Sequence, residues 1–267
     1  MPCNLETSLR RRLPVTDIEL SSVERFQLLS IRVKLSSTSD LDLTQRWVLE
    51  LFGEFNPAPF FLSPLRFEGC ERTRDSLSLT LSGAHCYGLG FGPEPPVNPL
   101  WTRCSIDDSA FGDRLGELIA TDRWNFYSLD TARCEGDGSP LTVSDSEVIN
   151  EILTAHAPHS QAWPGNPEIV HWYGVKGPRG EWVSLAALVR WESGQHILAS
   201  VVTVTEMRGQ GFARTLVRGI GAEMQRQGVK WLGLGVAHDN VSAQRAYERA
   251  GFERRANFTT YSLAPSS

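Results

Sequence analysis

The sequence predicts an α+β fold, in which helices pack on a mixed sheet, with an additional region in front of it. The main observation is that, from about Leu141, short β-branched apolar runs alternate with segments whose apolar residues recur at helical spacing. A second observation is a glycine-rich turn that joins one such run to the next helical segment, within His196–Arg226. The third is composition: 41% hydrophobic and 21% charged residues over a length of 267 are ordinary for a globular protein of one large or two small domains.

Residues 1–97 form an N-terminal region whose role the pattern does not indicate. We expect a strand at Phe26–Leu35, a helix at Asp42–Phe55 and a strand at Ser76–Gly83. The next segment, Tyr87–Pro99, contains three glycines at alternate positions, a spacing also found in nucleotide-binding turns. Because prolines rather than a helix follow these glycines, we interpret this segment as a loop or linker.

Residues 98–140 are expected to form a lead-in or a degenerate half-domain. They contain a segment with helical spacing, Phe111–Asp122, and a strand, Trp124–Leu129, followed by a loop. The more regular domain of residues 141–263 comes after this loop.

The domain of residues 141–263 has the order helix, strand, strand, strand, helix, strand, helix, strand. Its first helix begins at Ser144 or Asp145 as N-cap and ends before Pro158. Two strands follow, at Glu168–Val175 and Glu181–Trp191. This order predicts a mixed sheet with helices packed on it.

The glycine-rich turn, Arg208–Ala213, lies between the strand His196–Thr203 and a helix. The helix is indicated by apolar residues at helical spacing: Phe212, Leu216, Val217, Ile220 and Met224. A strand, a glycine turn and a helix N-terminus together present unpaired N–H groups to an anion. Arg208 and Arg214 add positive charge beside this end.

Two blocks of the second half resemble the GNAT superfamily of N-acetyltransferases. Arg208, Gly211 and Ala213 match the pattern Gln/Arg-x-x-Gly-x-Gly/Ala of that family, at the same junction of strand and helix. The segment Gly228–Phe252 resembles the family's next strand and helix and ends in its Tyr-Glu-x-x-Gly-Phe signature, which begins at Tyr247. The resemblance covers roughly the C-terminal half and implies a GNAT-like acetyltransferase fold for residues 141–263.

The resemblance also implies where acetyl-CoA binds. The strand segment would hold the pantetheine arm, the turn would hold the pyrophosphate, and the asparagine that begins the last helix would meet the coenzyme while it caps that helix. These residues are Val201, Val202, Thr203, Arg208, Gly209, Gln210, Gly211, Phe212, Ala213, Arg214 and Asn240.

The chemistry of acyl transfer needs an acid and a base. By the resemblance, Tyr247 gives a proton to the departing thiolate, for which a phenol is a suitable acid. The base is open: some relatives carry a glutamate where this chain has Gly235, so we expect either His196, near the start of the central strand, or His238, or a chain of waters.

The acceptor pocket and the glycines of the following strand are further expectations. Polar and aromatic groups for the acceptor are available in the segment His156–Trp163, including His159, and at Glu168. Gly233 and Gly235 share one face of their strand, so we expect a close approach there, either by the acetylated arm or by packed protein.

The sequence therefore predicts an acyl-CoA-dependent N-acetyltransferase in which an amine attacks acetyl-CoA directly, without a metal. The acceptor is a small-molecule or protein amine, and the oligomeric state is open. The alternative is a non-catalytic acyl-CoA-binding or scaffold protein. A net charge of −5 does not indicate binding to nucleic acid. No apolar run is long enough to span a membrane. Five cysteines without a C-x-x-C pair favour the reducing cytoplasm as the location.

Overall fold

The computed structural model describes residues 33–35, 41–53, 57–83, 86–107 and 111–263. All of these belong to the unit Arg32–Ser267 of the chain. Most of the strand expected at Phe26–Leu35 lies outside the described residues, of which Val33–Leu35 are a strand.

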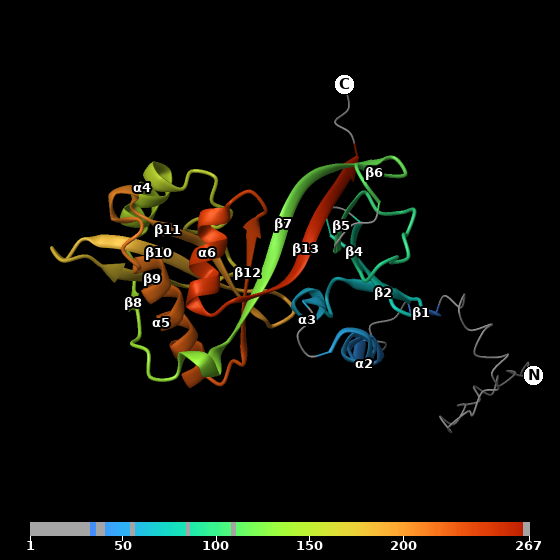
Figure 1. Cartoon of the computed structure of the whole chain (residues 1–267), viewed down its shortest axis with the longest axis horizontal. Coiled ribbons are helices and arrows are strands. Elements are labelled where there is room, and N and C mark those ends of the chain that lie inside the picture. The colour runs from blue at the N-terminus through green and yellow to red at the C-terminus, as the bar shows by residue number, and fades with distance from the viewer. Residues whose placement is uncertain (1–32, 36–40, 54–56, 84–85, 108–110, 264–267) are drawn as a thin grey trace, which may run out of the picture. The chain divides into compact units, whose positions relative to one another are not determined.

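The described part of the first half contains short helices and strands (Figure 1). Its elements are β1 (Val33–Leu35), α2 (Leu41–Phe52), α3 (Ala58–Phe61), β2 (Phe67–Arg72), β3 (Leu77–Leu81), β4 (Tyr87–Phe91), β5 (Arg103–Asp107), β6 (Arg114–Leu115), β7 (Leu118–Asp130) and the 3₁₀ helix η3 (Thr131–Cys134).

The second half has helices between its strands. Its elements are β8 (Leu141–Thr142), α4 (Ser146–His156), β9 (Ile169–Lys176), β10 (Trp182–Arg190), β11 (His196–Thr203), the 3₁₀ helix η4 (Thr205–Met207), α5 (Phe212–Arg226), β12 (Trp231–Ala237), α6 (Val241–Ala250) and β13 (Glu253–Leu263). This confirms the order of elements expected from Leu141 onward, and Asp145 is the N-cap of α4.

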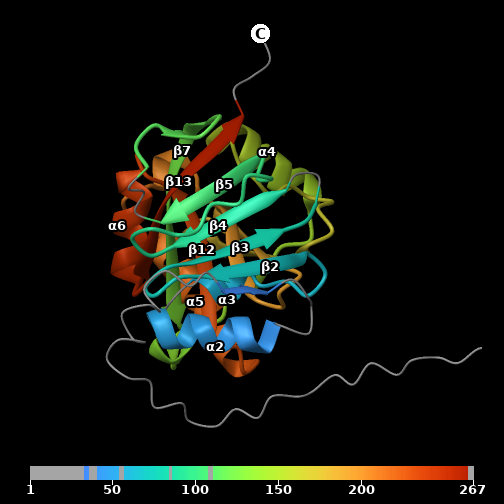
Figure 2. The same cartoon turned by 90° about the vertical axis from the view of Figure 1, so that its right-hand side faces the viewer.

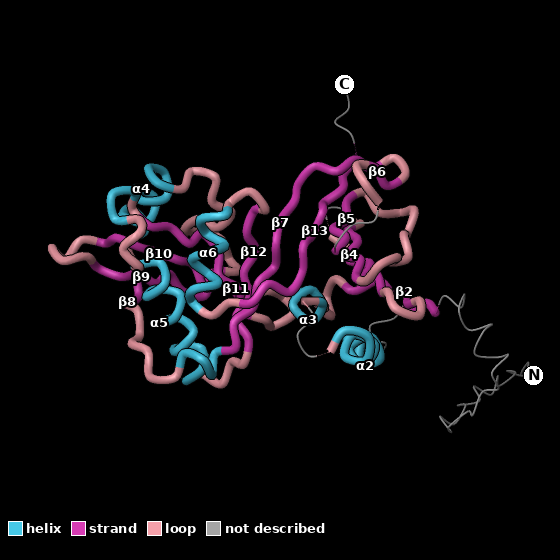
Figure 3. The backbone as a smooth tube through the Cα atoms, viewed as in Figure 1, coloured by secondary structure: helices cyan, strands magenta, loops and turns pink. Residues whose placement is uncertain are grey.

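The strands form one sheet of mixed direction. Its order is β1-β2-β3-β4-β5-β13-β7-β12-β11-β10-β9-β8, with β6 paired to β7. Two neighbouring pairs are parallel, β4 with β5 and β11 with β12. In the second half the parallel strands are connected through α5, whereas the corresponding connection between β4 and β5 contains no helix (Figure 3).

The two halves exchange strands at the centre of the sheet. β7 comes before the second half in sequence, yet it lies between β12 and β13 and pairs antiparallel with both. β13, the last strand, in turn pairs with β5 of the first half. Figure 1 shows β7 and β13 running side by side across the molecule as its longest strands. The boundaries expected near residues 97 and 140 therefore fall within one continuous sheet.

Helices cover both faces of the sheet. α5 and α6 cover one face. The core beneath them contains apolar residues of β10, β11 and β12, with Leu198, Leu232 and Leu234 among them. α4 covers the opposite face of β9 to β11. On the same opposite face, α2 and α3 pack against β2 to β4 and against Phe126 of β7 (Figure 2).

Two expectations for the region 87–122 are wrong. Phe111–Asp122 is not a helix: it holds turns, β6 and the start of β7, and both Gly112 and Gly116 have positive φ, which interrupts a helix. Tyr87–Phe91 is the strand β4 rather than a loop. Its glycines are needed for packing, because a Cβ at Gly88 would lie 2.1 Å from the indole of Trp101.

Candidate functional site

The sheet opens between β11 and β12. These strands pair only through His196, Ile197 and Leu198, which lie opposite Leu232, Gly233 and Leu234. Beyond Leu198, the described pairing of β11 is with β10 alone. Among the described residues, the edge Ala199–Thr203 therefore has no strand partner on the β12 side, and an extended ligand with amide groups can add to such an edge as a strand would.

A bulge and a fixed loop hold this open edge in place. Leu185 pairs with Val202 and Ala187 pairs with Ala199, so β11 carries one residue more than β10 between them. Within the bulge Ser200 has a φ of 49°, which a residue other than glycine rarely adopts. Its hydroxyl accepts from Ala162 N–H at 3.0 Å and donates to Ala162 C=O at 2.8 Å.

Buried Ser184 of β10 anchors the end of β11. Its hydroxyl donates to the C=O of Val202 at 2.7 Å and lies 3.0 Å from the hydroxyl of Thr203. The chain then turns through η4 to the helix α5. The predicted pantetheine-binding residues thus lie on a strand whose position is fixed from the β10 side, leaving its other edge open.

The turn before α5 leaves backbone N–H groups at the helix N-terminus without partners inside the helix. Gly209 and Gly211 have φ of 77° and 87°, a conformation that strains any residue with a Cβ, although no protein atom lies within 4 Å of where that Cβ would be. Gly211 is the N-cap of α5, and no side chain caps the helix. Because the first helical hydrogen bond runs from Thr215 N–H to Gly211 C=O, the N–H groups of Phe212, Ala213 and Arg214 have no partner inside the helix.

The two arginines of the turn have different surroundings. Arg208 donates to the C=O of Thr203 at 3.1 Å and to the C=O of His156 at 2.9 Å, so its side chain ties the turn to the ends of β11 and α4. Arg214 is exposed on the first turn of α5, beside a cavity that Lys176 also lines. Arg208 therefore holds the turn in place, whereas Arg214 lies on the first turn of α5 beside the cavity.

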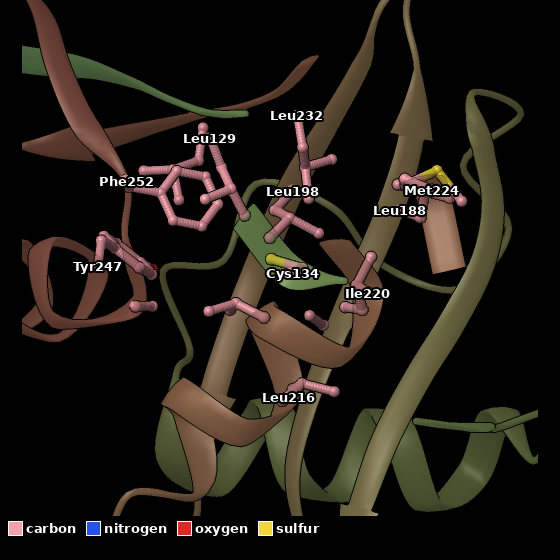
Figure 4. Close-up of a cluster of buried hydrophobic side chains, with 14 of the residues drawn as sticks. Leu129, Cys134, Leu188, Leu198, Leu216, Ile220, Met224, Leu232, Tyr247 and Phe252 are labelled. Atoms are coloured by element: carbon pink, nitrogen blue, oxygen red, sulfur yellow. The ribbon is translucent and has the colours of Figure 1, made fainter. Parts of the chain in front are cut away.

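Asn240 and Tyr247 lie on α6, as expected. The side chain of Asn240 is the N-cap of α6 and accepts from Ala243 N–H at 3.1 Å. Tyr247 is 8% exposed and packs against Phe252 with 5.9 Å between ring centres (Figure 4). It belongs to the same apolar cluster as Val201 of the open edge, and burial raises the pKa of its hydroxyl to about 12.

His196 lies away from the open edge, at the start of β11. It is paired with Arg190 on β10, and burial together with the Arg190 charge lowers the pKa of its imidazole below the usual 6.5. The Nδ1 of His156 lies 3.0 Å from the hydroxyl of Thr205 and helps to fix η4. His159 is exposed.

The two glycines of β12 differ in what approaches them. A Cβ at Gly233 would lie 2.8 Å from both Ile197 and Phe60 and 2.9 Å from Phe126, so packed protein explains this glycine. Gly235 is exposed, and a Cβ there would lie 3.4 Å from the indole of Trp124 on β7, which is ordinary contact. The sequence pattern did not indicate that Phe60 and Trp124 of the first half border this part of the sheet.

Comparison with known proteins identifies the second half. Residues 143–252 match the sequence profile of the acetyltransferase (GNAT) family. This segment is a GNAT acetyltransferase domain. No curated protein sequence matches the chain.

Solved structures resemble the chain beyond the GNAT domain. A Drosophila protein has a TM-score of 0.55 at 13% identity, and the alignment covers 89% of this chain and 99% of that one, so the fold is shared over both halves. A GCN5-related N-acetyltransferase from Kribbella flavida has 16% identity, a TM-score of 0.48 and coverage of 72% and 87%. Another from Sphaerobacter thermophilus has 13% identity, a TM-score of 0.46 and coverage of 86% and 94%.

The GNAT domain needs residues outside the matched segment to complete its sheet. β7 and β13 both lie outside residues 143–252, yet β7 is the antiparallel neighbour of β12 along its whole length. In the described part of the chain, no helix is long and apolar enough to cross a membrane.

Proposed function

We propose that this chain transfers the acetyl group of acetyl-CoA to an amine by direct attack within a ternary complex. The observation that carries the proposal is the continuity of the open edge Ala199–Thr203 with the uncapped N-terminus of α5. An extended arm with amides fits the first, and a pyrophosphate fits the second. This combination suits a coenzyme A thioester, and the acetyltransferase family of the domain favours acetyl-CoA as the donor.

The reaction that this site would support moves one acetyl group and one proton. The neutral amine attacks the thioester carbonyl, the new C–N bond forms, and the C–S bond breaks as the intermediate collapses. The amine nitrogen loses its proton to solvent or to a base, for which His196 is the candidate on β11. The thiolate takes a proton, for which Tyr247 is the candidate donor.

The state of these two groups suits their proposed roles. Because the pKa of Tyr247 is raised to about 12, its hydroxyl keeps its proton at neutral pH and remains a donor. Because the pKa of His196 is lowered, its imidazole is largely neutral at the same pH and remains an acceptor. Because His196 lies at the start of β11, away from the open edge Ala199–Thr203, a base at His196 would act through water.

The setting and the acceptor are also part of the proposal. The four described cysteines, Cys70, Cys86, Cys104 and Cys134, are all free thiols, which supports a reducing cytoplasm. The acceptor is a small-molecule or protein amine that approaches the exposed Gly235 from the face opposite α5 and α6.

Thiol release from acetyl-CoA, measured across a panel of amines, tests the proposal. The panel includes polyamines, free amino acids, aminoglycosides and peptides with a free N-terminus or lysine. We expect amine-dependent release of coenzyme A and an acetylated product by mass spectrometry. Tight binding of acetyl-CoA without turnover on every amine would favour the alternative, a non-catalytic acyl-CoA-binding protein.

A further inference from the structure

A second cavity lies on the face opposite α5 and α6, where the two halves of the chain meet. It measures about 430 Å³, which is within the range of small-molecule sites. The first half contributes α3 and the starts of β4 and β5, and the GNAT domain contributes the start of β9 and the turn between β10 and β11. We refer to it as the inter-half pocket.

The walls of the inter-half pocket are aromatic and firmly held. Phe61 lies 5.3 Å from Trp191 between ring centres, and Phe60 packs edge-on against Phe126 at 5.0 Å. The turn after β10 is tied to α3, because the hydroxyl of Ser193 donates to the C=O of Phe60 at 2.7 Å. The pocket therefore exists before any ligand binds, which reduces the entropic cost of binding.

The first half contributes positive charge to the pocket. Arg66 and Arg103 line it together with Tyr87. Burial raises the pKa of the Tyr87 hydroxyl, and the charges of Arg103 and Arg66 partly oppose that rise. Arg66 donates through Nε to the C=O of Ser82 at 2.7 Å, which fixes its guanidinium while its other N–H groups remain available.

The GNAT domain contributes negative charge to the pocket. Glu168 and Glu192 line it, and Glu192 accepts from the hydroxyl of Ser63 at 3.2 Å. The backbone of Glu168 is held by Arg190 N–H at 2.9 Å. Within the described residues, no ion pair joins these carboxylates to Arg66 or Arg103, so both charges are available to a ligand.

The inter-half pocket is separate from the proposed coenzyme site. Phe60, Phe126 and Ile197 pack against Gly233 and close the sheet between them. The strand residues His196–Leu198, which span roughly 7 Å, lie between the pocket's turn and the point where β11 leaves β12. A ligand in this pocket therefore does not need to contact the acetyl group.

We propose that the inter-half pocket binds a free, zwitterionic α-amino acid with an apolar side chain. The ammonium group lies at Glu168 and Glu192, the carboxylate at Arg66 and Arg103, and the side chain against the rings of Phe61 and Trp191. Charge-assisted hydrogen bonds at both ends fix its orientation, and the aromatic walls take its apolar body.

The test uses calorimetry on the full chain with L-leucine, L-methionine, L-phenylalanine and L-tryptophan. For the best of these, two analogues are compared: one N-acetylated, which lacks the ammonium, and one amidated, which lacks the carboxylate. We expect each analogue to bind about tenfold more weakly than the parent amino acid. If none of the four binds at millimolar concentration, the proposal is wrong.

Matched variants locate the binding. Glu168→Gln is expected to reduce the preference for a free ammonium, and Arg103→Gln the preference for a free carboxylate. Glu151→Gln, at an exposed position of α4, is the control and leaves both preferences unchanged. Preferences that persist in both pocket variants would place the amino acid elsewhere. Unchanged acetyl-CoA affinity in the same variants shows that the chain is folded and separates this result from the proposed function.

Discussion

At the scale of single residues, Tyr247 is the clearest test of the proposed chemistry. Tyr247→Phe keeps the ring that packs on Phe252 and removes only the hydroxyl. We expect kcat to fall by about 10² to 10⁴, the usual contribution of a positioned acid, while the Kd for acetyl-CoA changes little. Single-turnover rates and calorimetry on the same preparation measure both quantities. A variant that turns over at the parent rate would indicate that water, rather than Tyr247, protonates the departing thiolate.

Tyr247 also predicts a pH effect on stability. Its folded-state pKa of about 12 lies above the usual 10, so the folded state holds this proton more tightly than the unfolded chain does. Its contribution is fully present below pH 10 and is lost as the pH rises towards 12. Urea unfolding at a series of alkaline pH values should show a smaller loss of stability in Tyr247→Phe than in the parent chain; equal losses would contradict the burial of the hydroxyl.

His196 gives a prediction about the pH dependence of activity. Since burial and Arg190 lower its pKa, the neutral base should persist below pH 6.5, and kcat/KM should fall only at lower pH. Arg190→Gln removes the neighbouring charge, so the acidic limb should move to higher pH. His196→Gln should abolish that limb. A profile that is the same in all three proteins would exclude His196 as the base.

At the scale of elements, the junction of β11 and α5 was predicted well from the sequence, and its neighbours were not. Alternating apolar residues, two glycines and helical periodicity are local signals, so they identified β11, the turn and α5 from one stretch of chain. The gap beside β11 depends on where β12 leaves it, and this long-range pairing has no local signature. Arg208 likewise donates hydrogen bonds to two carbonyl groups, those of Thr203 and His156. The second lies at the end of α4, and the sequence of the turn does not indicate where α4 lies.

The wrong predictions have the same cause. Phe111–Asp122 has apolar residues at helical spacing, yet its last part, Leu118–Asp122, pairs with β13 and β6, so tertiary pairing overrode the local pattern. The glycines of β4 were interpreted as loop residues because the sequence does not reveal that Trp101 and Ile106 pack on them.

The turn before α5 gives a prediction with a matched control. Gly211 has positive φ, which aspartate and asparagine both tolerate better than most residues and which strains both similarly. Gly211→Asp places a negative charge at the helix N-terminus where the pyrophosphate would lie, whereas Gly211→Asn has the same size without the charge. We expect acetyl-CoA to bind at least about tenfold more weakly to the Asp variant than to the Asn variant, by calorimetry. Equal affinities would place the pyrophosphate elsewhere.

At the scale of the whole molecule, the exchanged strands should make the two described halves unfold together. Phe126 of β7 is 1% exposed and packs against Phe60 and Phe61 of the first half as well as against Gly233 of the GNAT domain. Phe126→Ala should cost about 3–5 kcal/mol of unfolding free energy. We expect one cooperative transition at lower denaturant, seen alike by tryptophan fluorescence and circular dichroism.

The control for this prediction is Leu263→Ala, at the exposed end of β13, which should change stability by less than about 0.5 kcal/mol. Two separate transitions in the Phe126 variant, with the GNAT domain melting at the parent midpoint, would show that β7 does not couple the halves.

Hydrogen–deuterium exchange with and without acetyl-CoA tests the central claim most directly, because it needs no knowledge of the acceptor. The claim is that the coenzyme adds to the open edge of β11 and places its pyrophosphate on the N-terminus of α5. We expect acetyl-CoA to slow exchange of the amides in Ala199–Thr203 and Gly209–Arg214, and to leave those of β2 to β5 unchanged. Acetyl-CoA that binds with no added protection in these two segments, or with protection confined to the first half, would contradict it.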